Sequence, residues 1–374
     1  MKFTDVNPIT NFQQNKITKS IISTIRKGDF ILGKNVKKFE KKFSKLSNSK
    51  YAVGCATGTD ALLLALKSLN LKKNDEVIIP GMSYISTGLC VALNNIKIVF
   101  ADINNETGLI CLENVKKKIS KKTKVVIPVN LYGQKVDIKL LRKIVGKRIY
   151  IVEDSAQSHF SYSCYNCRNY FNNICCKKER NHQYSDLSCY SFYPSKNLGA
   201  YGDGGIITTN NSSIYSKLKI LRNLGATKKN VHEYEGLNSR LDTIQASILL
   251  EKIKYTNDHN DYRRKISSFY DEELSLINEV KLTQSKPGSS RHLYVIRVKN
   301  RNKLAKYLIK NKIPVQYHYP YSLNKAGALR KKIKKVKLIN SEKWAKECLS
   351  LPLYPYMPLN EAKRVVNFIK KFYY

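Results

Sequence analysis

Apolar residues along this chain follow helical spacing in some stretches and form short continuous runs in others. One face of a predicted helix carries apolar side chains three or four positions apart: Val36, Phe39, Phe43 and Leu46. Short apolar runs of the kind found in parallel sheets lie at residues 51–53, 77–80, 98–100, 125–129 and 150–152. Because such runs alternate with helical stretches, the pattern predicts an α/β fold with a mostly parallel sheet.

The last third of the chain has a different order of predicted elements. Residues 243–270 predict one long helix that leaves the first domain. A strand follows, and helical stretches come after it, at residues 293–298, 304–309 and 365–372. We therefore expect a large α/β domain over residues 1–250 and a smaller C-terminal α/β domain over residues 251–374.

Candidate chemistry begins with a carboxylate and a lysine. Asp154 follows the apolar run at 150–152, so its carboxylate should emerge at the carboxyl end of a strand, where open α/β sheets bind ligands. Lys196 lies downstream, in the Gly-, Asn- and Ser-containing segment 191–205. Taken singly, the two residues fit a helix cap and a surface lysine. Together they supply the Schiff-base amine and the anion facing a pyridine nitrogen that pyridoxal phosphate (PLP) chemistry needs.

A candidate phosphate site precedes these residues. Gly58 and Thr59 lie just before a buried helix predicted over residues 61–69. The first-turn amides of a helix have no intrahelical acceptors, and the helix dipole favours a negative charge beside them. This segment therefore predicts an anion site, although Gly-Thr before a helix is common and is weak evidence by itself.

Several separate segments resemble the DegT/StrS family of PLP-dependent nucleotide-sugar aminotransferases, and the resemblance runs from about Gly28 to the C-terminus. The segments that carry it, in the family's order, are residues 58–62, 128–134, 153–157, 191–205 and 238–246. The resemblance implies the aspartate-aminotransferase type of fold, also called PLP fold type I. It also implies PLP as the cofactor and a two-half transamination.

The family's cofactor residues map onto this chain one by one. The resemblance implies that Lys196 holds PLP and that Asp154 keeps its ring nitrogen protonated. Asn238 matches a residue that family members contribute to the phosphate of the neighbouring subunit's cofactor, which implies a homodimer with shared active sites. The other cofactor-binding positions are Tyr84 for ring stacking, Gln157 for the pyridoxal hydroxyl, and Ser191, Gly58 and Thr59 for the phosphate.

Two later segments, 316–325 and 351–355, look most like the branch that aminates C3 of UDP-linked 3-keto-glucuronic acid derivatives. Arg240, His318 and Tyr319 match positions near the sugar and its anionic groups, where a planar guanidinium suits a carboxylate. The resemblance implies a keto-sugar nucleotide as substrate and glutamate as amino donor, for polysaccharide or glycan biosynthesis. Aminotransferases of dTDP-linked 3-keto- or 4-keto-6-deoxyhexoses are the alternative.

The chain of 374 residues has a formal net charge of +39, from 67 Lys and Arg against 28 Asp and Glu. A nucleic-acid-binding protein would gather this charge on one face among aromatic residues, whereas the lysines here are scattered in short clusters. We therefore expect no nucleic-acid partner, although a basic field would attract a nucleoside diphosphate. A non-catalytic basic binding protein on the same scaffold is the alternative from another class. His159 is interpreted as a buried histidine outside the site.

Five of the nine cysteines crowd into one window: Cys164, Cys167, Cys175, Cys176 and Cys189. The first two have metal-ligand spacing, but the second half of a zinc signature is badly spaced, so no metal is expected. We interpret residues 163–184 as an exposed insertion that lengthens the loop before Lys196. The cysteine usage favours a reducing compartment, and neither a long apolar stretch nor a signal pattern is found. We expect a cytoplasmic protein without a membrane segment.

Overall fold

The computed structural model of the protein describes residues 1–162, 184–333 and 336–374, and its largest element is a seven-stranded sheet in the order β1-β7-β6-β5-β4-β2-β3. β7 is antiparallel to both of its neighbours, and the other strands of this sheet run parallel to one another. The strands are β1 (Tyr51–Cys55), β2 (Glu76–Pro80), β3 (Lys97–Ala101), β4 (Thr123–Val126), β5 (Tyr150–Asp154), β6 (Leu187–Ser191) and β7 (Gly205–Thr209). The predicted mostly parallel α/β sheet is confirmed.

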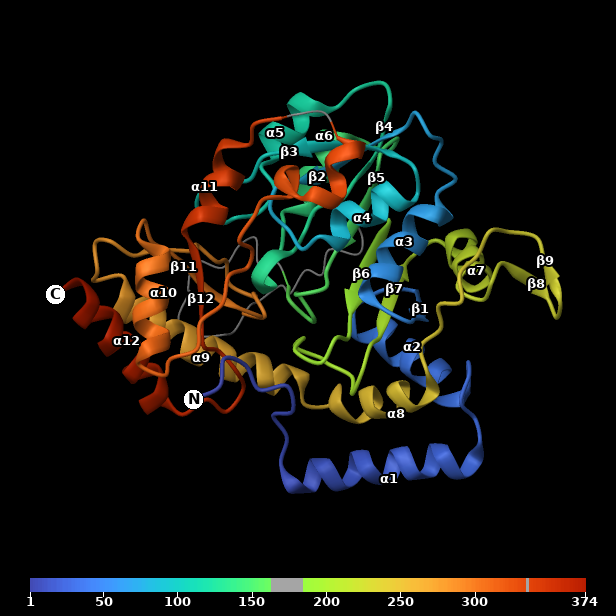
Figure 1. Ribbon diagram of the computed structural model, residues 1–374. Helices are drawn as coiled ribbons and strands as arrows, with labels where there is room; N and C mark the ends of the chain where they lie inside the picture. The colour runs from blue at the N-terminus through green and yellow to red at the C-terminus, as the bar shows by residue number, and fades with distance from the viewer. Residues whose placement is uncertain (163–183, 334–335) are drawn as a thin grey trace.

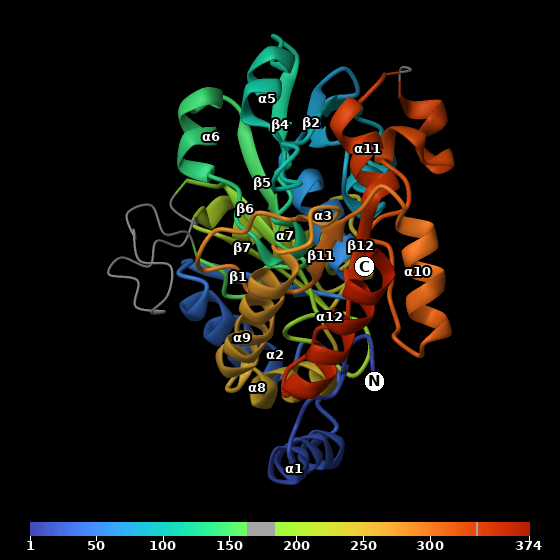
Figure 2. The same cartoon turned by 90° about the vertical axis from the view of Figure 1, so that its left-hand side faces the viewer.

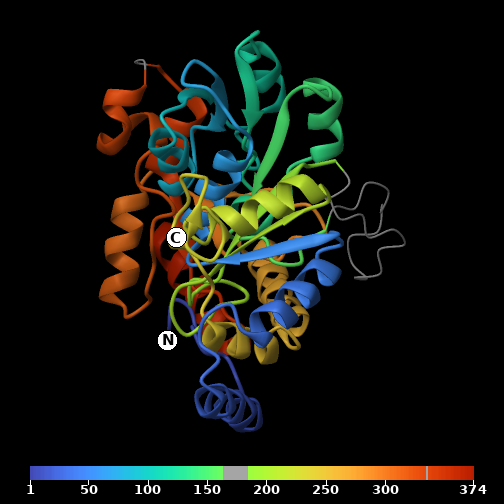
Figure 3. The same cartoon turned by 90° about the vertical axis from the view of Figure 1, so that its right-hand side faces the viewer.

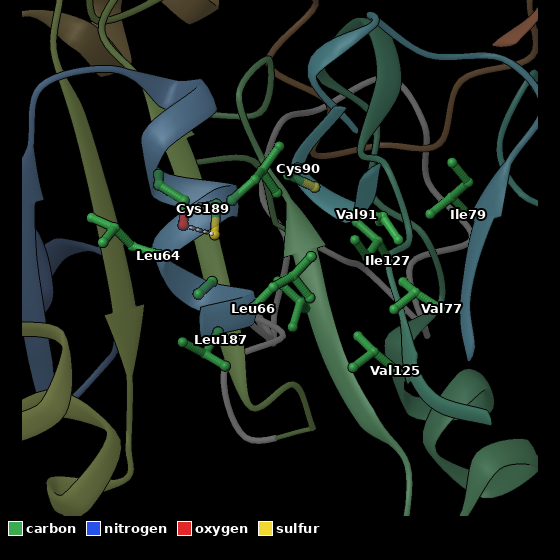
Figure 4. Packing of buried hydrophobic residues seen from close by; sticks show 14 of the residues in the cluster. Leu64, Leu66, Val77, Ile79, Cys90, Val91, Val125, Ile127, Leu187 and Cys189 are labelled. Atoms are coloured by element: carbon green, nitrogen blue, oxygen red, sulfur yellow. Dashed lines mark hydrogen bonds between the residues drawn. The ribbon is translucent and has the colours of Figure 1, made fainter. Parts of the chain in front are cut away.

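Helices cover both faces of this sheet. Alternate residues of one strand point to opposite faces, so Val77 and Ile79 pack with α3 and α4, whereas Ile78 between them packs with α5 and α6. Figure 4 shows the first of these cores, where Leu64 and Leu66 of α3 lie against the sheet. The helices of this part are α2 (Lys34–Leu46), α3 (Gly58–Ser68), α4 (Ser86–Leu93), α5 (Leu112–Lys118), α6 (Ile138–Val145), α7 (Ser212–Leu221) and α8 (Thr243–Lys252).

The edge strand β1 is also covered on both sides. α2 and α8 pack with β1, β6 and β7 on one face, where Phe39, Phe43 and Phe192 form a buried aromatic cluster. α7 contributes to the core on the other face. Figure 3 shows α7 and α2 on either side of the blue strand β1. The edge of the sheet is therefore buried beneath helices on each of its faces.

The C-terminal part has its own core around a three-stranded antiparallel sheet in the order β10-β11-β12. Tyr270, Ile296, Leu349 and Val365 are buried together in it. α9 and α12 lie side by side against this sheet, as Figure 2 shows. The elements are α9 (Thr256–Leu274), β10 (Lys281–Leu282), β11 (Tyr294–Arg297), α10 (Arg301–Lys310), α11 (Ile339–Glu347), β12 (Cys348–Leu351) and α12 (Leu359–Tyr373).

The remaining elements are short or peripheral, apart from the N-terminal helix α1 (Asn11–Lys27), which lies along α8 (Figure 1). The chain also forms the hairpin β8 (Ala226–Lys228) and β9 (Val231–His232) and the 3-10 turns η1 (Leu131–Gly133), η3 (Leu323–Lys325) and η4 (Gly327–Lys332). Within the described residues, no helix is both long and apolar enough to cross a membrane.

Two predictions about elements are wrong. The single helix predicted over 243–270 is two helices, because α8 packs on α1 and α2 whereas α9 packs on α12, and the chain turns between them at 253–255. The strand predicted at 125–129 ends at Val126. The predicted insertion at 163–184 lies outside the described residues except for its last residue. Four of the five clustered cysteines also lie outside them. The fifth, Cys189, is buried in β6.

Candidate active site

A cavity of about 500 Å³ opens beside the carboxyl ends of several strands of the large sheet. Residues that follow β1, β2, β5 and β6 line it, and residues from the C-terminal part close it. The residues in its wall that the sequence predicts for the site are Gly58, Thr59, Tyr84, Asp154, Gln157, Ser191, Lys196, His318 and Tyr319. Asn238 and Arg240 are predicted site residues that do not line it.

Lys196 and Asp154 reach the cavity from two different connections of the sheet. Asp154 is the last residue of β5. Lys196 lies in the connection between the antiparallel strands β6 and β7, where Ser191 pairs with Gly205. Burial lowers the pKa of Lys196 to about 8, and the charge of Asp154 opposes this shift. Burial also raises the pKa of Asp154, against hydrogen bonds from Thr87 and Ala156 and the charge of Lys196. The lysine can therefore lose its proton near neutral pH while the carboxylate is held by donors.

The N-terminus of α3 forms one end of the cavity. Thr57 caps the helix, because its hydroxyl accepts a hydrogen bond from the amide of Asp60 at 2.9 Å. A side chain at Gly58 would place its Cβ 2.5 Å from Cβ of Ser191, so only glycine allows the helix to approach that strand so closely. The first-turn amides, including that of Thr59, and the Ser191 hydroxyl together suit a phosphate.

Gln157 is held in one orientation by its neighbours. Its Oε1 accepts a hydrogen bond from the Tyr132 amide at 2.7 Å, and its Nε2 donates to the Tyr319 hydroxyl at 2.8 Å. One amide proton of Nε2 is left for a ligand. The ring of Tyr84 lies 5.7 Å from that of Tyr319 and is 56 % exposed, which is the state of a ring that faces an open cavity.

His318 joins the cavity to the C-terminal sheet. Its Nδ1 lies 2.8 Å from the Ser350 hydroxyl, and its ring stacks on Phe3 at 5.9 Å between centroids. Burial and the charge of Lys196 lower the pKa of His318 to about 4. At neutral pH this imidazole is therefore uncharged and offers a hydrogen bond rather than a positive charge.

Asn238 and Arg240 lie on the segment that leads into α8. Asn238 is exposed, and Arg240 donates a hydrogen bond to Oδ1 of Asn223 at 3.1 Å. The segment is anchored by Ser239 between them, whose hydroxyl donates to Asp60 at 2.7 Å. The two residues thus lie near the N-terminus of α3 without facing the cavity of their own chain.

A buried polar network behind Lys196 was not found from the sequence. Nδ2 of Asn197 donates to the Ser290 carbonyl at 2.9 Å and to Oδ1 of Asn260 at 2.6 Å, while its Oδ1 lies 2.8 Å from Nδ1 of His292. A carbonyl only accepts, so the amide nitrogen must face Ser290, and Nδ1 of His292 must carry the proton. Burial, together with the charges of Lys196 and nearby side chains, holds the pKa of His292 well below its usual value.

His292 consequently presents a neutral imidazole to the cavity, with Nε2 as an acceptor. The position of Asn197 next to Lys196 was the one signal in the sequence for this network. His292 gave none, because its partner is 95 positions away along the chain.

His159 is fully buried and does not line the cavity. It packs against the rings of Tyr190 and Phe192, each at 5.7 Å between centroids, and among the described residues neither of its nitrogens has a partner at hydrogen-bonding geometry. Burial and the charge of Lys196 lower its pKa to about 3, while the nearby Ser191 backbone opposes this shift.

Comparison with known proteins identifies the architecture around this cavity. The DegT/DnrJ/EryC1/StrS aminotransferase family matches residues 11–370. The chain belongs to this family. It is 35 % identical over 346 residues to the UDP-2-acetamido-2-deoxy-3-oxo-D-glucuronate aminotransferase of Pseudomonas aeruginosa, covering 92 % of each chain. It is also 35 % identical to the dTDP-3-amino-3,6-dideoxy-alpha-D-galactopyranose transaminase of Aneurinibacillus thermoaerophilus, covering 100 % of this chain and 99 % of that one.

Solved structures of sugar aminotransferases share the fold. DesV of S. venezuelae superposes with a TM-score of 0.92 at 29 % identity, covering 99 % of this chain and 98 % of that chain. NtdA of Bacillus subtilis, solved with the bound cofactor PMP, has a TM-score of 0.88 at 27 % identity and covers 97 % and 82 %. The chain is therefore a sugar aminotransferase of the PLP-dependent type, as the sequence predicts.

The residues of the cavity fit this cofactor. An amine with a lowered pKa and a buried carboxylate share one wall, and a helix N-terminus with a close-approach glycine lies at one end. The volume of about 500 Å³ is in the range of sites for small molecules and cofactors. The sugar aminotransferase thus has side chains suited to a phosphate, a ring nitrogen and an aldehyde in the same cavity.

Proposed function

We propose that this sugar aminotransferase transfers an amino group from glutamate to C3 of a UDP-linked 3-keto-glucuronic acid derivative, for polysaccharide or glycan biosynthesis. The similarity to the Pseudomonas aeruginosa 3-oxo-glucuronate enzyme supports this substrate. The observation that carries the proposal is that the first of the two segments resembling that branch, 316–325, pairs with the residue just before the second, 351–355. Gln316 and Ser350 exchange both backbone hydrogen bonds, and Nδ1 of His318, which lines the cavity, lies 2.8 Å from the Ser350 hydroxyl.

The chemistry assigned to this chain depends on two side chains. PLP, when bound, supplies an electron sink that lets a proton leave the carbon bearing the amino group. Lys196 would hold the cofactor through Nζ and, once released, take and return that proton at Nζ. The lowered pKa of Lys196, about 8, supports this role because a larger share of the amine is neutral near physiological pH than for an ordinary lysine. Asp154 would keep a proton on the ring nitrogen.

Other residues of the cavity wall would bind and orient the cofactor. The amides of Gly58 and Thr59 and the hydroxyl of Ser191 would bind its phosphate, as the helix N-terminus and the close approach support. Gln157 would donate its remaining amide proton to the pyridoxal hydroxyl, and Tyr84 would cover the ring.

A homodimer with shared sites is part of the proposal. Among the described residues, no arginine lines the cavity, and His318 is uncharged at neutral pH, so one chain lacks a strong partner for a uronate carboxylate. Arg240 and Asn238 lie outside the cavity of their own chain, and Asn238 is exposed. Both would serve the cavity of a second copy, Asn238 at the phosphate and Arg240 at the anionic sugar.

The division of the chain into residues 1–250 and 251–374 also stays a proposal. The turn at 253–255 and the separate core around β11 support a boundary in this region. The five cysteines among the described residues are free, and this supports a protein that functions in the reducing cytoplasm.

An aminotransferase of dTDP-linked 3-keto-6-deoxyhexoses is the second candidate. The Aneurinibacillus thermoaerophilus relative is 35 % identical over the whole of this chain, and the cavity of one chain has no arginine among the described residues. A sugar without a carboxylate would need none.

A panel of keto-sugar nucleotides tests the proposal. Purified enzyme with PLP and glutamate should aminate the UDP-linked 3-keto-glucuronate and leave the dTDP-linked 3-keto- and 4-keto-6-deoxyhexoses almost unchanged, as followed by mass spectrometry of the products. Lys196→Ala is the control, because it removes the amine and should abolish all turnover. Preference for a dTDP-linked sugar would overturn the proposed substrate.

A further inference from the structure

A chain of hydroxyl groups ends on the carboxylate of Asp154. Oγ1 of Thr87 lies 2.7 Å from Oδ2 of Asp154, and Oγ of Ser83 lies 2.7 Å from Oγ1 of Thr87. Thr87 is on α4, is fully buried and does not line the cavity, whereas Ser83 precedes α4 and lies at the cavity wall. The three side chains therefore connect α4 to the end of β5 behind the proposed cofactor site.

The protons of this chain can be assigned by counting donors. An ionised carboxylate only accepts, so Thr87 must donate its one hydroxyl proton to Asp154. Thr87 then has no proton for Ser83, so Ser83 donates to Thr87. The other carboxylate oxygen, Oδ1, accepts the amide of Ala156 at 3.2 Å, which is a longer contact. Thr87 thus makes the shorter of the two hydrogen bonds that the described residues give to the carboxylate of Asp154.

The surroundings of Asp154 otherwise oppose its negative charge. Burial raises its pKa, and the side chains of Cys90, Cys189 and Tyr319 lie near it without supplying a positive charge. Lys196 is the cation of the described part of the chain that acts on Asp154, and its effect on the pKa of Asp154 is smaller than that of the hydrogen bonds. The largest influence that favours the ionised carboxylate is the bond from Thr87.

We propose that Thr87 is a positioning residue for transamination: its hydroxyl, oriented by Ser83, holds Asp154 as an ionised carboxylate in one rotamer at the cavity wall. This inference rests on the proposed role of Asp154 at the ring nitrogen. A proton shared between that nitrogen and Asp154 then stays on the nitrogen, because donation by Thr87 lowers the affinity of the carboxylate for the proton. Without the hydroxyl, the same proton moves to the carboxyl group.

The test is the protonation state of the ring nitrogen in the holoenzyme. The enzyme is reconstituted with PLP labelled with nitrogen-15 in the ring, and the nitrogen-15 chemical shift is measured across pH. Thr87→Val keeps the shape and removes the hydroxyl, whereas Thr87→Ser keeps the hydroxyl and removes the methyl. Thr256→Val is the matched control: Thr256 is 1 % exposed on α9, its hydroxyl donates to the Lys252 carbonyl, and it does not line the cavity.

The variants separate the possible outcomes. In Thr87→Val, the ratio of protonated to unprotonated ring nitrogen should fall about tenfold or more, since a hydrogen bond to a charged group is lost. Thr87→Ser and Thr256→Val should match the wild type. A wild-type shift in Thr87→Val would overturn the inference, and so would loss of protonation in Thr87→Ser, because packing would then explain the effect. Asp154→Asn distinguishes the two levels: if it leaves the nitrogen protonated, the proposed role of Asp154 itself fails.

Discussion

Burial acts on three titratable side chains around the cavity and changes each of them in a different way. It lowers the pKa of Lys196 to about 8, which makes the amine usable near neutral pH. It raises the pKa of Asp154, where Thr87 acts against it. At His159 it meets little opposition and lowers the pKa to about 3. Burial thus favours a neutral amine at Lys196, is opposed by a hydrogen bond at Asp154, and keeps the imidazole of His159 uncharged without a role in the cavity.

His159→Phe tests this reading of the buried histidine. The unfolded chain binds a proton at this residue below about pH 6.5, whereas the folded chain does not until about pH 3, so stability present above pH 6.5 is lost as the pH falls between these values. At pH 5 this one residue should cost about 2 kcal/mol of unfolding free energy, which Phe should restore. Denaturant unfolding at pH 7 and pH 5 measures the difference.

The control for this experiment is His232→Phe, because His232 is exposed. Activity of His159→Phe should stay within a few-fold of the wild type, since the side chain does not line the cavity. An equal loss of stability between pH 7 and pH 5 in His159→Phe and in the wild type would contradict the assignment.

At the scale of elements, the site depends on where helices begin. α3 begins at Gly58 against Ser191 of β6, and α4 begins just after Ser83 and Tyr84 and carries Thr87. Both helices follow strands of the large sheet and pack on the same face of it. The starts of these two helices therefore provide the proposed phosphate site, an aromatic ring at the cavity and the hydroxyl that donates to Asp154.

Gly58→Ala should weaken cofactor binding. The new Cβ would lie 2.5 Å from Cβ of Ser191, so α3 or β6 must shift at a cost of about 1–3 kcal/mol. If the shift opens the phosphate end of the cavity, the dissociation constant of PLP should rise about tenfold. Equilibrium dialysis or absorbance titration with PLP measures it. Gly327→Ala, where an added Cβ meets nothing within 4 Å, should leave the constant unchanged.

The sequence predicts the features that depend on neighbouring residues, and it fails for those that depend on contacts between residues far apart along the chain. α2, β1, β2, α3 and β11 follow from local apolar spacing, and the place of Asp154 follows from the rule that open α/β sheets bind ligands at the carboxyl ends of their strands. Lys196 was predicted from its Gly-, Asn- and Ser-containing segment and from the family resemblance. The break between α8 and α9 does not, because it arises from different packing partners. The hydrogen bond from Thr87 to Asp154 joins residues 67 positions apart, so no local sequence pattern predicts it.

At the scale of the whole molecule, the proposed dimer is open to a complementation test. If each site combines Lys196 of one chain with Asn238 of the other, then Asn238→Ala should weaken PLP retention, and dilution that separates the dimer should weaken it too. Lys196→Ala chains should be inactive alone. After the two variants are mixed and allowed to exchange, half of the dimers are mixed and have one intact site.

The mixture should therefore regain about a quarter of the wild-type activity per chain at limiting PLP. Turnover together with sedimentation measures both parts of the expectation. Arg240→Lys should lower activity on a uronate more than on a neutral 6-deoxyhexose, because the planar fork is lost although the charge remains. A PLP-saturated, fully active monomer would refute the shared site.

The polar network behind Lys196 has an evolutionary consequence. Asn197, Asn260 and His292 come from three distant segments, yet each satisfies a buried polar atom of another. A substitution at one of them leaves an unpaired group inside the protein, at a cost of about 1–3 kcal/mol. Substitutions at these positions should therefore occur together: a lineage that replaces one of these side chains should also replace its partners, or lose part of the stability of the buried network next to Lys196.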